Sequence, residues 1–332
     1  MSQPFIQSSW SKQDPPFDTP LRPKTLAEFL GQDPLKERLH VYIEAAKERG
    51  EPLGHCLFSG PPGLGKTTMV NILANAMGTK IVTTSGPAIE KAADLAGILT
   101  SLEEGDFLFI DEIHRLNRTI EEYLYPAMED FSLDLLIDSG PSSRSVQVQL
   151  KRFTLVGATT RSGLLSSPMR SRFALSCRLE FYKPEVLAKI IERSAKLLDI
   201  SIESNAAHEI ARRARGTPRI ANHLLRWVRD FAQIRKMSPI DTKTAAEALS
   251  MLNIDEKGLD EMDKKLLTTL IDTHKGGPVG LSTLAIALSE DPTTLSEVYE
   301  PYLILQGLLR RTPRGREATE LAYSHLGREK GE

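Results

Sequence analysis

The sequence predicts an α/β protein in which a parallel sheet is followed by a helical region and a smaller C-terminal part. In the first two hundred residues, short apolar runs alternate with amphipathic stretches. This alternation is typical of a parallel sheet covered on both faces by helices. From Pro184 to about Asn253 the pattern is helical throughout. A length of 332 residues suits two or three domains rather than one.

Five apolar runs are predicted as strands, and two of the stretches between them as helices. The predicted strands are 55–60, 80–86, 107–112, 153–160 and 177–182, and the predicted helices are 67–77 and 117–131. The apolar runs are short, as expected of strands that are buried on both faces of a sheet.

One segment, 133–150, interrupts this rhythm with two runs of alternating polarity around a Ser-Gly-Pro-Ser-Ser turn, which predicts a β-hairpin. The apolar residues on one face are Leu133, Leu135 and Ile137 in the first strand and Val146, Val148 and Leu150 in the second. A protruding apolar face can bind a partner protein. The alternative is that this face packs on its own domain.

The composition excludes several classes of protein. The hydrophobic content of 40% suffices for real cores, and no apolar run approaches the length needed to span a bilayer. The N-terminus lacks the features of a secretory signal and predicts a flexible arm over about 1–18. Cys56 and Cys177 are isolated in apolar stretches, which favours reduced, buried thiols in a cytoplasmic protein. The net charge of −2 means that any affinity for nucleic acid must come from a local patch.

The stretch GPPGLGKT (60–67) fits the phosphate-binding P-loop pattern, with a strand predicted before it and a helix after it. Gly63 and Gly65 allow backbone N–H groups to face phosphates at the N-terminus of the helix. Lys66 is expected to reach the β- and γ-phosphates of ATP. Thr67 is expected to hold Mg²⁺ through its hydroxyl, and Thr68 to contact a phosphate.

The second element of this site is FLFIDEIH (107–114), where a buried strand delivers Asp111 and Glu112 at its C-terminal edge. Ligands bind at this edge in open α/β sheets. Asp111 suits Mg²⁺ through water, whereas Glu112 suits orienting and deprotonating the attacking water.

These motifs resemble those of AAA+ ATPases, because GPPGLGKT, FIDEIH, GATT (157–160), SPMRSRF (167–173) and GTPRIANHLLRW (216–227) follow one another in the family's order. The resemblance is closest to the RuvB family, through LRPKTLAEFLGQ, TTSGPAIEK, LYPAMEDF, RTPRGR and the hairpin. It covers nearly the whole chain after about residue 18. It implies an ATP-driven DNA translocase that drives branch migration of Holliday junctions in recombination and repair.

The resemblance also implies partners. The resemblance implies that six copies of the chain form a ring around the duplex DNA arms of a four-way junction. It assigns the hairpin to docking on RuvA, the junction-binding protein, and places the junction resolvase RuvC in the same pathway. No membrane partner is expected.

Further residue roles come from the resemblance alone. Thr159 or Thr160 senses the γ-phosphate, with Thr160 matching the usual position better. Arg172 is the arginine finger that reaches the neighbouring subunit's ATP, with Arg170 competing for this role. Arg219 is the second sensor, on the lid domain. The residues that line or contact the nucleotide are Leu21, Arg22, Tyr182, Glu129, Asp130 and Phe131.

The C-terminal part resembles a winged helix, with predicted helices at 262–273, 281–288 and 292–306. Four arginines follow between Arg310 and Arg316, and no acidic residue lies between Pro301 and Arg316 to balance them. Arg311 and Arg316 are expected to contact DNA phosphates as the two arms of the wing. Arg310 has the alternative of pairing with Glu317.

Together these features predict three domains. The large ATPase domain spans 1–182, a small helical lid 183–254 and the winged helix 255–332. Two other functions share parts of this architecture: a replication initiator and a regulator that binds ATP and DNA without productive hydrolysis. The hairpin before GATT disfavours the first, since an initiator carries a helical insertion there. Asp111, Glu112 and Arg172 disfavour the second.

Overall fold

The computed structural model describes residues 20–136 and 145–329, which form two compact units. One unit contains residues up to 186 together with 217–219, and the other contains 187–216 and 220–329. The predicted N-terminal arm, the turn of the predicted hairpin and Ile137 lie outside the described residues.

The first unit is built on a five-stranded parallel sheet with the strand order β2-β3-β6-β1-β7. The strands are β1 (Cys56–Ser59), β2 (Ile81–Ser85), β3 (Phe107–Asp111), β6 (Thr154–Thr159) and β7 (Leu175–Arg178). The strands are parallel, so their carboxyl ends lie at the same edge of the sheet. Because β6 pairs with both β1 and β3, the ends of these three strands are neighbours there. The predicted α/β class with a parallel sheet is confirmed.

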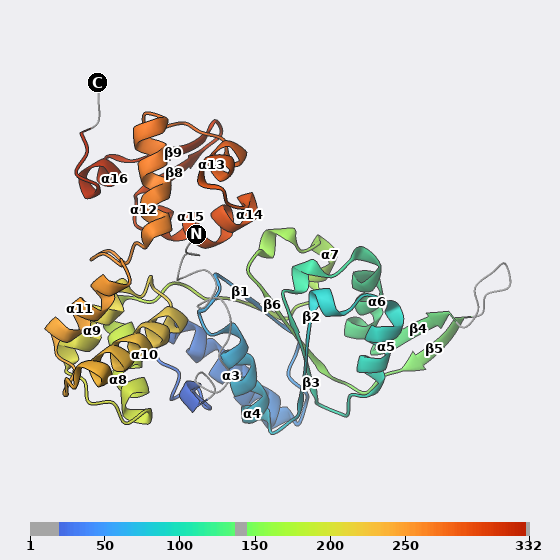
Figure 1. Cartoon of the computed structure of the whole chain (residues 1–332). Coiled ribbons are helices and arrows are strands. Elements are labelled where there is room, and N and C mark those ends of the chain that lie inside the picture. Colours follow the sequence, from blue (N-terminus) through green and yellow to red (C-terminus); the bar gives the residue numbers. More distant parts are fainter. Residues whose placement is uncertain (1–19, 137–144, 330–332) are drawn as a thin grey trace. The chain divides into compact units, whose positions relative to one another are not determined.

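Helices cover both faces of this sheet (Figure 1). On one face, α5 (Ala92–Thr100) and α6 (Arg118–Glu129) pack on alternate strand residues such as Leu108 and Ile110. On the other face lie α3 (Asp33–Arg49) and α4 (Lys66–Met77). The short helix α7 (Ser167–Ser171) follows β6.

The structure differs from the predicted elements in helices and in one strand. Helices α3, α5 and α7 were not predicted. The strand predicted at 177–182 is β7, which begins at Leu175 and ends at Arg178. The apolar residues beyond it do not extend the strand. Among them, Tyr182 is buried and donates a hydrogen bond from its hydroxyl to the Leu64 carbonyl in the P-loop (3.2 Å).

The predicted hairpin is present as β4 (Ser132–Leu136) and β5 (Ser145–Gln149), which extend beyond α5 and α6 (Figure 1). Its apolar face divides into two parts. Leu133 and Leu150 at the base are buried in the domain core, whereas Val146 is 44% exposed. The face therefore packs on its own domain at the base and is open to solvent farther out.

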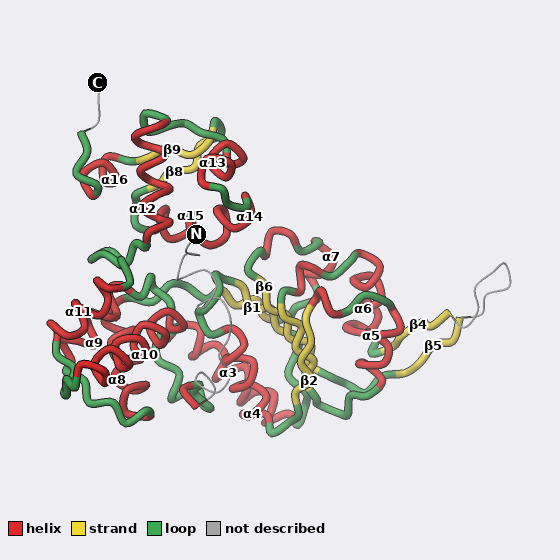
Figure 2. The backbone as a smooth tube through the Cα atoms, in the orientation of Figure 1, coloured by secondary structure: helices red, strands yellow, loops and turns green. Residues whose placement is uncertain are grey.

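The second unit begins with the helices α8 (Pro184–Leu197), α9 (Ser204–Arg213), α10 (Pro218–Arg235) and α11 (Thr242–Met251). Figure 2 shows this part as helices joined by loops, as predicted. Buried residues such as Leu187, Ile191, Leu224 and Leu225 repeat at helical spacing and form the core.

The C-terminal part has the order of a winged helix. Its elements are α12 (Glu261–Thr268) with a π-helical extension to Thr273, α13 (Leu281–Leu288), the segment Pro292–Leu305 in three helical pieces, β8 (Leu309–Thr312), β9 (Gly315–Ala318) and α16 (Glu320–His325). The strands β8 and β9 form the predicted wing. Val279 exchanges two backbone hydrogen bonds with Arg316, which fixes the wing to the preceding turn.

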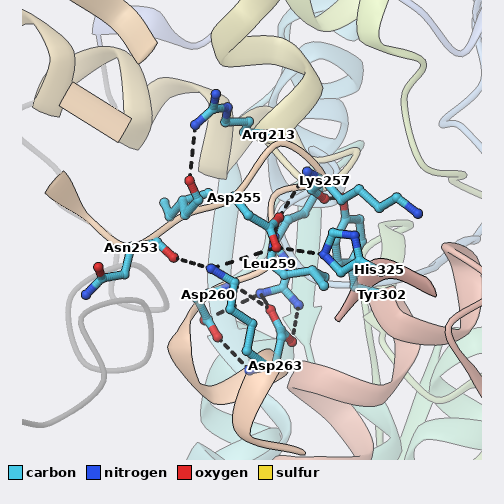
Figure 3. Close-up of polar contacts among 12 residues, drawn as sticks. Arg213, Asn253, Asp255, Lys257, Leu259, Asp260, Asp263, Tyr302 and His325 are labelled. Carbon is cyan, nitrogen blue, oxygen red and sulfur yellow. Dashed lines mark hydrogen bonds and ion pairs between the residues drawn. The ribbon is translucent and has the colours of Figure 1, made fainter. Parts of the chain in front are cut away.

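A buried polar cluster joins the helical lid to the winged helix (Figure 3). Arg215 is 5% exposed, forms ion pairs with Asp263 (3.1 Å) and Asp260 (3.7 Å), and stacks on the Tyr302 ring. Arg213 donates a hydrogen bond to the Ile254 carbonyl (3.1 Å) in the linker. Buried charges are stable only when they are paired.

The linker is held from the winged-helix side as well. His325 contacts Asp255 (2.8 Å), and the Tyr302 hydroxyl donates to the Lys257 carbonyl (2.5 Å), as Figure 3 shows. Lid and winged helix accordingly fall within one compact unit. No helix in the described part of the chain is long and apolar enough to cross a membrane.

Candidate functional site

The P-loop connects β1 to α4 with a backbone that requires glycine. Gly60 has φ of 139°, and an added Cβ there would lie 2.6 Å from the Leu179 carbonyl oxygen. Gly63 has φ of 80° and packs against Arg219. Positive φ and close backbone approach both exclude larger residues. The loop ends at Gly65, and α4 begins at Lys66, so Thr67 and Thr68 lie in its first turn. Free backbone N–H groups of such a turn attract anions.

Lys66 is the buried cation of this loop. Its side chain donates hydrogen bonds to the Gly60 (2.7 Å) and Pro61 (2.9 Å) carbonyls, and the residue is 7% exposed. Burial lowers the pKa of Lys66 to about 8, although the carboxylates of Glu112 and Asp111 oppose this shift. The ammonium group is therefore fixed by the loop and stabilised by the negative charge of both acids.

Asp111 and Glu112 follow β3 at the edge where β1 and β6 also end. The Asp111 carboxylate accepts the Glu112 backbone N–H (3.0 Å). Burial raises the pKa of Asp111, and the neighbouring Glu112 adds to this effect. Glu112 has φ of 48°, a left-handed conformation that is uncommon outside glycine and often marks functional sites.

The two adjacent threonines have different contacts. Thr160 donates a hydrogen bond from its hydroxyl to Glu112 Oε2 (3.0 Å), and its backbone N–H approaches the same oxygen (3.3 Å). Thr159 is fully buried and bonds to Nδ1 of His114 (2.8 Å). Thr160 is thus the threonine that contacts the candidate base, and its role as a phosphate sensor stays a prediction.

Other predicted nucleotide residues lie around the loop. The Arg219 backbone N–H donates to the Gly63 carbonyl (3.4 Å), and Tyr182 contacts Leu64 as described above. Leu21 is buried and Arg22 is half-buried. These residues belong to the same compact unit as the P-loop, although Arg219 is far from it in sequence.

Arg172 lies beside Glu129, another residue predicted to contact nucleotide, and not beside the P-loop residues described above. It donates to Glu129 Oε2 (2.9 Å) and to the Pro168 carbonyl (2.7 Å), and its guanidinium lies 4.2 Å from the centre of the Tyr125 ring. Asp130 and Phe131 directly follow Glu129, and Phe131 packs edge-on against Phe153. Arg170 is exposed on α7. Among residues 20–136 and 145–329, none of the partners of Arg172 belongs to the P-loop.

Two residues near these sites were not predicted from the sequence. His114 lies beside Glu112, and Tyr125 stacks on Arg172. His114 is two residues beyond Glu112 in FIDEIH, which is the only signal that the sequence carries for it. Tyr125 has no such signal, because its contact depends on how α6 and α7 pack.

The residues expected at a magnesium ion fit its preferences in part. Mg²⁺ keeps several waters and binds one or two carboxylates together with substrate phosphates. Asp111 supplies a carboxylate and Thr67 a hydroxyl, both beside the P-loop. In the described chain no three His, Cys, Asp or Glu side chains form a metal cluster.

The wing arginines are paired with acids in the folded chain. Both Arg311 (2.6 Å) and Arg316 (2.8 Å) donate to the carboxylate of Glu300, which is 1% exposed. Arg310 pairs with Glu317 (2.8 Å), which confirms the alternative for this residue. The inference that the basic tip lacks balancing acids is wrong, because Glu300 and Glu317 lie just outside the stretch 301–316. Arg314, at the turn of the wing, is exposed and has no partner among the described residues.

Comparisons with known proteins agree with this architecture. The family described as the Holliday junction DNA helicase RuvB P-loop domain matches residues 21–179. The RuvB AAA lid domain matches 182–255, and the RuvB C-terminal winged helix domain matches 256–327.

Individual relatives match along nearly their whole length. The Holliday junction branch migration complex subunit RuvB of Protochlamydia amoebophila is 65% identical over 326 residues, 98% of each chain. The protein of the same name from Parabacteroides distasonis is 59% identical over 94% of this chain and 92% of its own. A solved structure of the Thermotoga maritima RuvB Holliday junction branch migration motor has a TM-score of 0.85 at 54% identity, covering 93% of this chain and 99% of that chain.

Proposed function

This chain belongs to the RuvB family of AAA+ ATPases, and we propose that it acts as a hexameric ring on the DNA arms of a Holliday junction together with RuvA. It is a branch migration motor that hydrolyses ATP. The observation that carries this function is the convergence of Lys66, Asp111, Glu112 and Thr160 at the edge formed by β1, β6 and β3. We infer an ATPase domain over 1–182, a lid over 183–254 and a winged helix over 255–332.

Each residue of this edge has a proposed role in hydrolysis. Lys66 and the backbone of the P-loop bind the phosphates, and Thr68 adds a hydroxyl. Thr67 and Asp111 hold Mg²⁺, which neutralises phosphate charge as bonds to the γ-phosphate change. Glu112 orients and deprotonates the attacking water. Thr160 and Arg219 sense the γ-phosphate, while Leu21, Arg22 and Tyr182 line the nucleotide.

The proposed arginine finger implies an oligomer, and membership of the RuvB family favours a hexameric ring. Arg172 contacts Glu129, Pro168 and Tyr125 rather than the P-loop of its own subunit. This supports a role in trans, in which Arg172 and the backbone of 129–131 reach the ATP of the next subunit. A ring supplies such a neighbour to every subunit.

The resolvase RuvC is proposed to act in the same pathway. The protein is proposed to work in the cytoplasm.

The outer part of the hairpin is proposed to dock on RuvA. Val146→Glu and Val148→Glu are expected to reduce the stimulation of the ATPase by RuvA and to leave its basal rate unchanged. The reason is that docking would bury the new charge. The measurement is turnover with junction DNA, with and without RuvA. Gln147→Glu is the matched control, since Gln147 is exposed on the opposite face of the same strand.

A second control separates docking from folding. Leu133→Glu places a charge in the domain core and is expected to lower the thermal midpoint. If Val146→Glu also loses basal turnover and unfolds early, the outer hairpin is part of the core and the docking role is wrong.

The wing is proposed to hold DNA by its phosphates. Replacing Arg311 and Arg316 together by Ala is expected to weaken duplex binding equally for all sequences. When the logarithm of the binding constant is plotted against the logarithm of the salt concentration, each lost contact should reduce the slope by about one unit per subunit engaged. The measurement is duplex affinity over a salt series.

Because both arginines neutralise Glu300, the test needs a variant that separates stability from binding. Adding Glu300→Gln to the double variant removes the unpaired buried charge and is expected to restore stability but not affinity. An unchanged salt slope would mean that DNA is held elsewhere.

The function as a whole is tested with a synthetic four-way junction. The chain is expected to dissociate it into duplexes when ATP is present, and faster when RuvA is added. A chain that binds the junction but never separates its arms would instead be a DNA-binding regulator.

A further inference from the structure

We propose that His114 is a positioning residue for ATP hydrolysis, which fixes the carboxylate of Glu112 in the orientation needed to activate water. The inference rests on the role of Glu112 proposed above. Nδ1 of His114 lies 3.1 Å from Glu112 Oε2 and 2.8 Å from Thr159 Oγ1. The His114 side chain is only 8% exposed, so it is held in this position by its surroundings.

The local backbone explains how His114 reaches Glu112. Glu112 adopts its left-handed conformation, and a single 3-10 turn over Ile113–Arg115 follows at once. This turn reverses the chain direction, so that the His114 side chain lies beside the carboxylate of Glu112. Gly86 lies so close that an added Cβ would be 2.5 Å from the Glu112 carbonyl oxygen, so the turn is packed firmly in place.

The groups around the carboxylate converge on one of its oxygens. Oε2 accepts the Thr160 hydroxyl and lies near the Thr160 backbone N–H and His114 Nδ1. Among the described residues, Oε1 has no hydrogen-bond donor of its own. One oxygen is thereby fixed, and the other remains available for water.

The charge on Glu112 selects the tautomer of His114. An ionised carboxylate can only accept hydrogen bonds, so its approach to Nδ1 is favourable when Nδ1 carries the proton. The single N–H at Nδ1 is then shared between Glu112 Oε2 (3.1 Å) and Thr159 Oγ1 (2.8 Å), and Thr159 Oγ1 also accepts the Arg161 backbone N–H (2.9 Å). Burial lowers the pKa of His114, which favours the neutral ring. The neutral imidazole thus offers the carboxylate an N–H that it shares with Thr159, without a full positive charge.

Three substitutions distinguish this role from simple packing. An Asn side chain places its amide near the position of Nδ1, whereas Gln places it near Nε2, and Leu fills space without a donor. His114→Leu and His114→Gln are expected to lower kcat by about 10- to 100-fold, because small displacements of a catalytic group have effects of this size. His114→Asn is expected to recover most of the rate. The KM for ATP should change by less than about twofold in all three.

A double substitution tests whether His114 acts through Glu112. In the Glu112→Gln background, His114→Leu is expected to cause almost no further loss of residual turnover, since the group it positions is gone. Thermal midpoints of all variants check folding. Equal losses in the Asn, Gln and Leu variants, or a full loss in the Glu112→Gln background, would overturn the proposal.

Failure of the underlying function gives a different result. Normal turnover of Glu112→Gln would overturn the role of Glu112 and this inference with it. An inactive Glu112→Gln together with an unchanged kcat in His114→Leu would overturn the role of His114 alone.

Discussion

Lys66→Ala is expected to abolish ATP binding, whereas Glu112→Gln retains binding and loses hydrolysis by at least about 10²-fold. The two side chains have separate tasks at the same edge of the sheet. Lys66 provides the buried ammonium group that attracts phosphates, and without it the loop keeps only uncharged donors, the backbone N–H groups and the hydroxyls of Thr67 and Thr68. Glutamine keeps the size of Glu112 and can accept the Thr160 hydrogen bond, but it cannot take a proton from water.

Binding and turnover must be measured separately, by titration with a fluorescent ATP analogue and by release of phosphate. Lys80→Ala is a control for loss of a positive charge, because Lys80 is exposed next to β2. Glu112→Gln with normal turnover would show that another group activates water.

Arg172→Ala is expected to bind ATP normally but to hydrolyse it about 10³- to 10⁵-fold more slowly, the range for an arginine finger in trans. Its partner Glu129 is half-exposed, so the loss of this ion pair should have little effect on folding. Mixing Arg172→Ala with Lys66→Ala should recover part of the activity. In such rings an intact P-loop from one subunit meets an intact arginine from its neighbour.

The same mixing experiment on Arg170→Ala decides between the two arginines. Arg170 is exposed on α7, and its loss should leave turnover near that of the unmodified chain if Arg172 is the finger. Verified co-assembly without any recovery would remove the support for a role in trans.

The sequence predicted which residues lie together at the site better than it predicted their surroundings. The P-loop and the pair Asp111–Glu112 are local patterns that each follow a strand. The structure brings them to the same edge of the sheet, because β1 and β3 are parallel and both pair with β6. The contact between Thr160 and Glu112 joins residues 48 positions apart, so the sequence left Thr159 and Thr160 as alternatives.

Features that depend on packing were missed or misjudged. Tyr182 resembled a strand residue but supports the P-loop. The apolar face of the hairpin is buried in the domain core at Leu133 and exposed to solvent at Val146. Glu300 neutralises Arg311 and Arg316 from a helix that precedes the wing. Such contacts arise only when separate elements meet, and composition along the chain does not reveal them.

We propose that ATP hydrolysis at the Lys66–Glu112 site drives the movement of junction DNA. The most direct measurement is the rate at which a four-way junction is dissociated by the unmodified chain and by Glu112→Gln, at equal junction occupancy and with RuvA present. We expect ATP-dependent dissociation by the unmodified chain and none by Glu112→Gln. Dissociation at equal rates, or by the unmodified chain with a non-hydrolysable ATP analogue, would contradict it.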